Sequence, residues 1–259
     1  MGARLAMQDV LGIGFTGVAL VVAEIILAIF TAKIIGRAFG LSEKLRDLIG
    51  VGVGICGVSA IIGASGAIKA EEEDSTYAIA TILIFGAIML FLYPIIGKAL
   101  GMSHQLYGYW TGLTIDNTAE AVATGMAFSE TAGNIATVVK LARNALMGFV
   151  VLLFALDYAK KGMTDQVDNK VKFLWNRFPK FLIGFLILSL AATAGVFTGG
   201  EVKAMKNLSQ WAFLLAFAGV GFRTRFADMK AGLKPFLVGL GVEGVVSIIM
   251  FILVTIFII

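Results

Sequence analysis

The chain has 259 residues, of which 59% are hydrophobic and only 15% charged, and its mean hydropathy is +0.92. An average soluble domain has about 45–50% apolar and about 25% charged residues. Composition therefore excludes a soluble globular protein and predicts an all-α polytopic membrane protein. The net charge of +4 is expected in cytoplasmic loops and does not indicate binding to nucleic acid.

Eight apolar segments follow from the lengths of the apolar runs and from the charges between them. Each crossing needs about 20 apolar residues, so eight crossings use almost the whole chain. We expect residues 1–259 to form one transmembrane domain, with a first-repeat portion at 10–100 and a second-repeat portion at 105–259. The segments cover about residues 10–34, 48–68, 76–96, 106–128, 135–156, 181–197, 208–222 and 235–259.

Lys and Arg are distributed unevenly over alternate loops, and these residues favour cytoplasmic loops. The set of loops with fifteen Lys and Arg residues is predicted to face the cytoplasm, and the set with four to face outward. Both termini are then on the outer side of the cell inner membrane. The fifteen are Lys33, Arg37, Lys44, Arg46, Lys98, Lys160, Lys161, Lys170, Lys172, Arg177, Lys180, Arg223, Arg225, Lys230 and Lys234; the four are Arg4, Lys69, Lys203 and Lys206.

The two ends of the chain resemble each other. A gapless alignment of residues 2–4 with 221–223 also aligns Glu24 with Glu243, each inside an apolar helix. By the loop count, the first helix enters from outside and the eighth from inside. A repeat of opposite orientation is typical of secondary transporters.

The second segment has six glycines within residues 50–66. Residues 52–57 match G-x-G-x-x-G, but charged helical residues precede them where a dinucleotide site needs a strand. Two interpretations remain: the small residues allow close helix packing, or they interrupt the helix between 52 and 57 at a ligand site. In the second case, Cys56, Gly57 and Ser59 would contact an anion at the N-terminus of a half-helix.

The fourth segment places two carboxylates, Asp116 and Glu120, on one helix face. Like charges about 6 Å apart repel by roughly 2.8 kcal/mol at an effective dielectric near 20. We therefore predict that they lie in the interior, near the broken second helix, and are neutralised by a proton, Na⁺ or a basic side chain. Thr114 and Asn117 would add oxygen ligands to this coupling-ion site. The alternative is a reentrant or interfacial loop with solvated carboxylates.

The fifth segment carries Lys140, Arg143 and Asn144 within about one helical turn. These side chains would either pair with the two carboxylates or hold an anionic substrate. Snorkelling to the outer interface is the alternative.

Several separate motifs resemble the YeiH-like family, whose members are described as sulfate exporters. The resemblance runs from about Gly2 to the C-terminus. It implies the fold of cation/proton antiporters and bile-acid-type symporters, with inverted repeats and two crossed broken helices. The motifs are residues 55–60, Lys69, residues 78–81, 85–86, 92–94, 135–144 and 232–235.

Two features depart from the family pattern. Family members have about two more N-terminal helices, so this chain is expected to be a truncated or naturally short form. Their fourth segment carries a His-acid pair followed by Gln, where this chain has Asp116, Asn117 and Glu120. The substrate or the coupling ion is therefore expected to differ.

The sequence predicts a secondary transporter that moves a small anion, such as sulfate, a sulfonate or a related organic anion, across the inner membrane and is coupled to H⁺ or Na⁺. Its other partner is the lipid bilayer, and a homodimer is compatible with the sequence. One Cys and one His leave no thiolate cluster, His-rich metal site or His-based relay. We expect neither a cofactor nor enzymatic activity. The alternative is a membrane sensor or channel-like protein without coupled transport.

Overall fold

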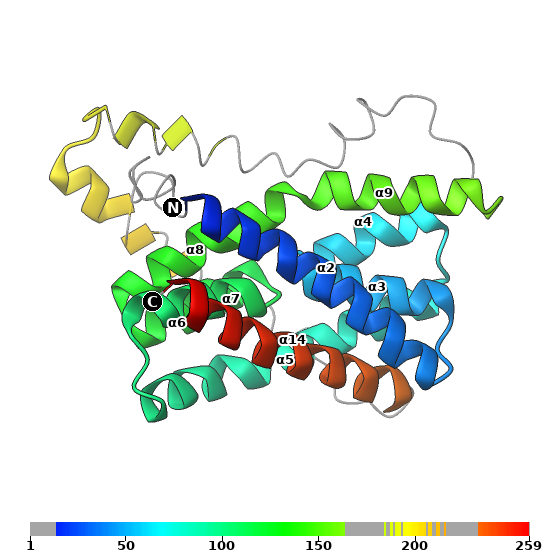
Figure 1. Cartoon of the computed structure of the whole chain (residues 1–259). Coiled ribbons are helices and arrows are strands. Elements are labelled where there is room, and N and C mark those ends of the chain that lie inside the picture. Colours follow the sequence, from blue (N-terminus) through cyan, green and yellow to red (C-terminus); the bar gives the residue numbers. More distant parts are fainter. Residues whose placement is uncertain are drawn as a thin grey trace.

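The computed structural model describes residues 14–163 and 233–258, together with scattered positions between 184 and 215. These residues contain helices and turns and no strand, which confirms the all-α fold for the described part (Figure 1). Two sequence predictions fall outside the continuous ranges 14–163 and 233–258. They are the segments at 181–197 and 208–222, and the alignment of residues 2–4 with 221–223. The helices are α2 (Gly14–Ala38), α3 (Glu43–Gly54), α4 (Val58–Ile68), α5 (Glu72–Ala99), α6 (His104–Thr114), α7 (Thr118–Phe128), α8 (Glu130–Ala145), α9 (Met147–Lys160) and α14 (Leu233–Ile258).

Within the described residues, four helical stretches are long and apolar enough to cross a bilayer. They are α2, α5, the consecutive pair α8–α9, and α14, with 25, 28, 31 and 26 residues. At 1.5 Å per residue, even the shortest covers about 37 Å, which exceeds the roughly 30 Å of a hydrocarbon core. They correspond to the first, third, fifth and eighth predicted segments. The second and fourth segments have a different structure.

The second predicted segment is a helical hairpin rather than a crossing helix. α3 ends at Gly54, residues 55–57 form a turn, and α4 starts at Val58. The predicted interruption is therefore confirmed. The prediction that this segment crosses the membrane is wrong, because α4 returns to the end where α3 began: Nζ of Lys44 donates a 2.6 Å hydrogen bond to the carbonyl of Lys69. We call residues 43–68 the first hairpin.

The fourth predicted segment is a second hairpin, residues 104–128. Its two helices run antiparallel, since the rings of Tyr107 and Phe128 stack at 4.0 Å and the Tyr107 hydroxyl donates to the carbonyl of Thr124. The turn is stabilised by Asn117, whose side chain accepts a 2.8 Å hydrogen bond from Ala119 N–H and so caps α7. The reentrant interpretation of this segment is therefore correct, although its carboxylates are buried and not solvated.

The two hairpins enter the protein from opposite ends. The base of the first lies beside the start of α5 and the end of α9, because Ser42 contacts Asp74 and Lys161 pairs with Glu43. The base of the second lies at the other end of α5, where a Cβ on Gly97 would touch Tyr107 and Phe128. Each hairpin reaches only part-way, since 12 residues of helix are about 18 Å long.

The tips of the hairpins meet in the middle of the molecule. A Cβ on Gly57 would lie 3.6 Å from that of Asp116, so the two turns are in contact. Gly57 has φ +66° and ψ −123°, a conformation that is essentially restricted to glycine. Crossed broken helices, as implied by the family resemblance, are thus replaced by two hairpins that meet tip to tip.

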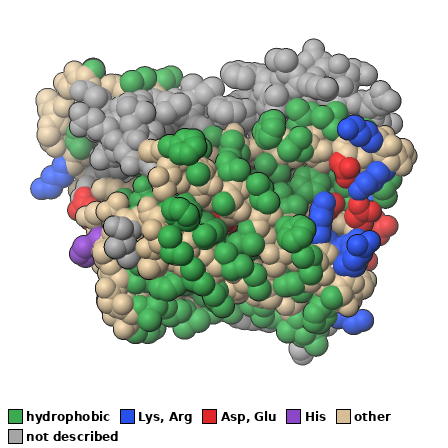
Figure 2. Space-filling model, in the orientation of Figure 1, with side chains coloured by type: hydrophobic (Ala, Val, Ile, Leu, Met, Phe, Trp, Pro, Cys, Tyr) green, Lys and Arg blue, Asp and Glu red, His purple; other side chains and the backbone are tan. Residues whose placement is uncertain are grey.

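Basic residues concentrate at the end of the molecule where the first hairpin enters, and a hydrophobic band covers the face beside it (Figure 2). The positive-inside rule therefore predicts that this end faces the cytoplasm. Two residues change sides relative to the loop count: Lys69 belongs to the cytoplasmic end with Lys44, and Lys98 to the opposite end, near the end of α5. Both changes follow from the hairpins, because a hairpin returns the chain to the side from which it entered.

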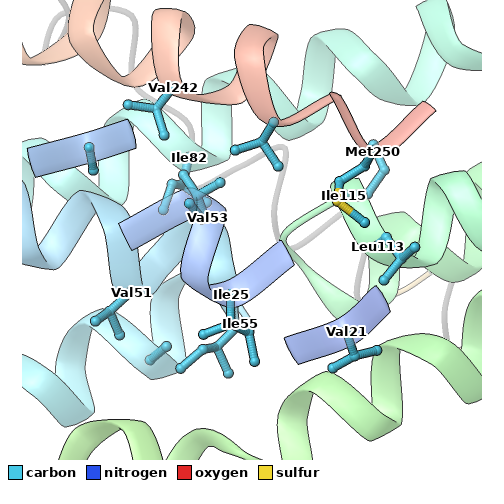
Figure 3. Close-up of a cluster of buried hydrophobic side chains, with 14 of the residues drawn as sticks. Val21, Ile25, Val51, Val53, Ile55, Ile82, Leu113, Ile115, Val242 and Met250 are labelled. Carbon is cyan, nitrogen blue, oxygen red and sulfur yellow. The ribbon is translucent and has the colours of Figure 1, made fainter. Parts of the chain in front are cut away.

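Apolar side chains from α2, both hairpins, α5 and α14 surround the hairpin tips (Figure 3). Close packing depends on small residues: a Cβ on Gly50 would come within 2.9 Å of the α2 backbone at Ile29, and one on Gly112 within 2.9 Å of the α8 carbonyl of Ala136. The close-packing interpretation of the glycines is thus also correct. Glycines in the same hairpin serve close packing within α3 and the chain reversal at its tip.

Candidate functional site

Six ionisable side chains are buried around the meeting point of the hairpins, each with 0–1% of its surface exposed. They come from α2, the second hairpin, α8 and α14, so the fold brings together residues that are up to 219 positions apart in the chain. Charged groups inside a membrane protein are costly and mark functional sites by default. We call this set the tip cluster; it consists of Glu24, Asp116, Glu120, Lys140, Arg143 and Glu243.

Arg143 holds the two hairpin tips together. The last carbonyls of a helix lack partners within the helix and carry partial negative charge. The Arg143 guanidinium donates to such carbonyls from both hairpins, and it also pairs with Oε1 of Glu24 at 3.1 Å and lies 3.9 Å from Oδ1 of Asp116. The carbonyl acceptors are Val53 and Gly54 of the first hairpin and Gly112, Leu113 and Ile115 of the second.

Lys140, one turn before Arg143 on α8, donates a 2.6 Å hydrogen bond from Nζ to the carbonyl of Ile55 in the first tip. Both cations are fully buried, so the snorkelling alternative is wrong. Their positions favour the counter-ion interpretation, because their donors are directed at carbonyls and carboxylates.

Two carboxyl groups of the cluster contact each other. Asp116 and Glu243 lie within hydrogen-bonding distance, although they belong to the second tip and to α14. None of their four oxygens receives a hydrogen bond from a described residue. Two ionised carboxylates are both acceptors, and this contact therefore requires a proton or a cation between them.

Glu120 is the most isolated member of the cluster. Both of its carboxyl oxygens are buried and without a hydrogen-bond partner in the described structure. The side chain lies against Gly86 of α5, where a Cβ would be 1.8 Å from Oε2. The absence of a side chain at position 86 is what allows the carboxyl group to lie there.

The charges of the tip cluster do not balance. Four carboxylates and two cations would give a net charge of −2 if every group were ionised. Burial of net charge in a low-dielectric interior is costly. Full ionisation of the cluster would therefore be costly unless protons or a cation balanced its charge.

The remaining predicted site residues surround the tips. Gly57 forms the first tip, and Cys56 beside it is partly buried, with Sγ 3.6 Å from Sδ of Met147. Ser59 is exposed, so the structure does not bring its hydroxyl into the buried cluster. Thr114 accepts a hydrogen bond from Tyr93 and donates one to the carbonyl of Trp110.

Asn144 belongs to α8 and packs beside the start of α7, where its Nδ2 donates a 3.0 Å hydrogen bond to Oγ1 of Thr118. The side chain of Asn117 is the cap of the same helix. The predicted residues thus lie around the two hairpin tips, and Ser59, in the first turn of α4, is the one among them whose side chain is exposed.

Sequence reasoning noted Glu24 and Glu243 but did not place them in the site. A single carboxylate within an apolar helix was the available signal, and their alignment with each other was a second one. Tyr93 had no such signal. Its hydroxyl connects Thr114 of the second hairpin at 3.0 Å with Ser247 of α14 at 2.7 Å.

Comparison with known proteins gives consistent matches along the chain. The family model described as "Conserved hypothetical protein 698" matches residues 1–239. A UPF0324 membrane protein of Nitratidesulfovibrio vulgaris is 35% identical over 249 residues, which cover 94% of this chain and 69% of the relative. The chain belongs to the UPF0324 membrane protein family. The predicted YeiH-like resemblance is thereby confirmed.

Other UPF0324 relatives carry more specific names. The UPF0324 inner membrane protein YeiH of Escherichia coli is 30% identical, over 92% of this chain and 68% of its own length. The UPF0324 membrane protein TauZ of Paracoccus denitrificans is 30% identical, over 88% of this chain and 68% of its own length. No solved structure matches. Together with the apolar helices, these relatives identify a multi-pass protein of the inner membrane.

Proposed function

We propose that this protein is a secondary transporter that moves a small anion across the inner membrane and couples this movement to H⁺ or Na⁺. The observation that carries the proposal is the meeting of two hairpins from opposite ends at a buried charged cluster. Irregular backbone at membrane depth is tolerated where it is enclosed by protein or lines a site. Helices that end near the midplane, with their ends directed at substrate and coupling ion, are typical of secondary transporters.

The coupling cation is assigned to the carboxylates. The tip cluster has two more carboxyl groups than cationic side chains, and Asp116 and Glu120 belong to the same hairpin. A cation that binds there neutralises charge that the protein leaves unbalanced. Thr114 and Asn117 flank the carboxylates, as proposed for the coupling-ion site.

The anion is assigned to the N-terminal ends of α4 and α7, which both begin at the tips. These ends carry partial positive charge and free N–H groups. The negative ends of α3 and α6 are already occupied by Lys140 and Arg143. Once protons or Na⁺ have neutralised the carboxylates of the tip cluster, an anion beside Gly57 and Asn117 would be attracted by these positive helix ends. Sulfate, sulfonates and related organic anions carry the negative charge that such helix ends attract.

Reconstitution tests this proposal. Purified full-length protein in liposomes is supplied with labelled sulfate, sulfite or taurine outside, under an imposed pH gradient, an imposed Na⁺ gradient, or neither. We expect gradient-driven accumulation of at least one anion, and loss of the gradient dependence in Asp116→Asn. Asp157→Asn, at the exposed end of α9, serves as the matched control and retains wild-type uptake.

The outcomes separate the classes of function. Uptake no greater than in empty liposomes for every anion and gradient would reject the transporter and favour a sensor. Anion flux that simply follows the anion gradient, without dependence on H⁺ or Na⁺, would favour a channel. Chemical conversion of the anion would indicate an enzyme, which we do not propose.

A further inference from the structure

We propose that Asp116 and Glu243 form one proton-binding carboxyl pair, so that the coupling ion at the hairpin tips is H⁺ and Glu243 of α14 supplies half of its site. This inference rests on the proposed function and makes it more specific. It adds Glu243 of α14 to a coupling-ion site that sequence reasoning restricted to the fourth predicted segment.

The contact between the two carboxyl groups carries the argument. They lie within hydrogen-bonding distance, and among the described residues no N–H or O–H donates to any of their oxygens. A carboxylate is an acceptor only, whereas a protonated carboxyl group has one donor. A single proton therefore converts the contact from repulsion between two acceptors into a hydrogen bond. No other change to the surrounding residues is required.

A metal cation fits this place less well than a proton. A hard cation is bound by several oxygen ligands that converge on one point. The neighbouring oxygens already make hydrogen bonds, the hydroxyl of Thr114 with Tyr93 and Trp110 and the side-chain carbonyl of Asn117 with Ala119, so a metal would compete with these contacts. In the described part of the chain, no group of three or more His, Cys, Asp or Glu residues is arranged to hold a metal ion.

The groups around the pair leave negative charge uncompensated. Arg143 lies 3.9 Å from Asp116 but is shared with Glu24 and the tip carbonyls, and Lys140 is bound to Ile55. The pair thus cannot be neutralised by these cations alone. The titratable and charged groups that face it are Glu24 of α2, Cys56 of the first tip, Tyr93 of α5, Glu120 of α7, and Lys140 and Arg143 of α8.

The place of the pair in the fold gives the proton a structural effect. Glu243 lies on α14, whereas Asp116 lies in the tip of the second hairpin. With the proton bound, the pair fastens this tip to α14. Without it, the two carboxylates repel and the tip is released. Binding and loss of H⁺ therefore act directly on the position of one hairpin.

Infrared spectroscopy tests the pair independently of transport, because a protonated carboxyl group and a carboxylate absorb at different frequencies. Spectra of the full-length protein in liposomes are compared at neutral and alkaline pH for wild type, Asp116→Asn, Glu243→Gln and the surface control Asp157→Asn. We expect a protonated carboxyl component at neutral pH in wild type and in the control. The component should be smaller in either pair variant.

Addition of Na⁺ at constant pH provides a second measurement on the wild-type protein, which does not depend on whether a variant folds. We expect Na⁺ to leave the protonated component unchanged. Displacement of that component by Na⁺ would overturn the inference, as would spectra of both pair variants that match the control.

Uptake assays keep this inference separate from the proposed function. Anion uptake driven by Na⁺ and insensitive to a pH gradient would overturn the proton pair while leaving the transporter in place. A wild-type protein with the expected infrared component but without uptake of any anion would support the pair and contradict the transporter. We expect uptake driven by the pH gradient, and loss of that dependence in Glu243→Gln.

Discussion

The side chain of Lys44 donates a 2.6 Å hydrogen bond to the backbone carbonyl of Lys69, 25 positions further along the chain. A continuous helix would place these residues about 37 Å apart. The contact therefore determines that the first hairpin returns to the cytoplasmic end. It also determines that α5 begins at the end where α3 began, since a hairpin does not change sides and a crossing helix does.

Labelling of single cysteines should reveal this arrangement. In a Cys56→Ser background, we expect Lys44→Cys, Lys69→Cys and Lys161→Cys to react with a membrane-impermeant maleimide in inside-out vesicles. Lys98→Cys should react in intact cells, because it lies at the other end of α5. Reaction of Lys69→Cys from the same side as Lys98→Cys would contradict the first hairpin.

Removal of the Arg143 side chain should destabilise the protein strongly. Arg143→Ala leaves carbonyls of both tips and the Glu24 carboxylate buried without their donor, and loss of one partner of a buried ion pair costs about 3–5 kcal/mol. Arg143→Lys should recover only part of this, because a single ammonium cannot reproduce the planar fork of donors. The rate at which Cys56 reacts with a thiol reagent during heating measures the effect at the first tip.

The control for this experiment is Lys160→Ala, which removes a cation from the exposed end of α9. It should change the free energy of unfolding by no more than about 0.5 kcal/mol, as ordinary surface substitutions do. A similar, small effect of Arg143→Ala would show that the tips are held by other contacts.

A methyl group at position 86 should disturb the site through Glu120. In Gly86→Ala, the new Cβ would lie 1.8 Å from Oε2 of Glu120, so the buried carboxyl group has to move. We expect destabilisation by about 1–3 kcal/mol, as for other overpacked cores, with a lower thermal midpoint in detergent. Gly244→Ala is the matched control, because no atom lies within 4 Å of its Cβ position.

A double variant identifies the cause. Glu120→Ala removes the side chain that meets the new methyl group, so adding it to Gly86→Ala should restore part of the lost stability. If the double variant is no more stable than Gly86→Ala, the damage does not act through Glu120.

The ion pair between Lys161 and Glu43 should make a small, pH-dependent contribution to stability. The hydrogen bond from Lys161 at 2.6 Å keeps the pKa of Glu43 below its ordinary value of 4.5. The pair therefore stabilises the fold above pH 4.5, and this contribution disappears as the pH falls through the lowered pKa. About two fifths of both side chains is exposed, so we expect only about 0.2–1 kcal/mol.

Comparison of Glu43→Gln with wild type across pH measures this contribution. The difference in unfolding free energy should be present at pH 7, decrease in acid and decrease in 1 M salt, where charges on the surface are screened. A difference that is unchanged below the ordinary pKa of Glu43 would mean that the variant acts through packing.

The sequence was sufficient to predict a break between Gly52 and Gly57, which the structure places at residues 55–57, and the burial of Asp116 and Glu120. Glycine density weakens a helix, and a carboxylate within an apolar run requires an interior partner, so both features have local causes. The reversal of the chain has no such cause. An apolar run of about 20 residues has the length of one crossing helix and also of two short helices.

The partners of Arg143 were hidden for a different reason. Its main acceptors are backbone carbonyls, which every residue carries, so no side-chain pattern marks Val53 or Leu113 as its neighbours. Glu243 was visible as an isolated carboxylate, but its contact with Asp116 depends on how α14 packs against the second hairpin. Both relationships are tertiary and require the assembled bundle.

A consequence of the Arg143 contacts concerns leakage. One guanidinium holds the first tip and the second tip at the same time, and the two tips approach it from opposite faces of the membrane. Withdrawal of one tip would leave Arg143 bound to the carbonyls of the other, whereas withdrawal of both would leave it with Glu24 and without its carbonyl acceptors. If the proposed transport involves movement of the tips, we expect that loss of the contacts to one tip makes loss of the contacts to the other more costly, which would disfavour a continuous pore through the bilayer.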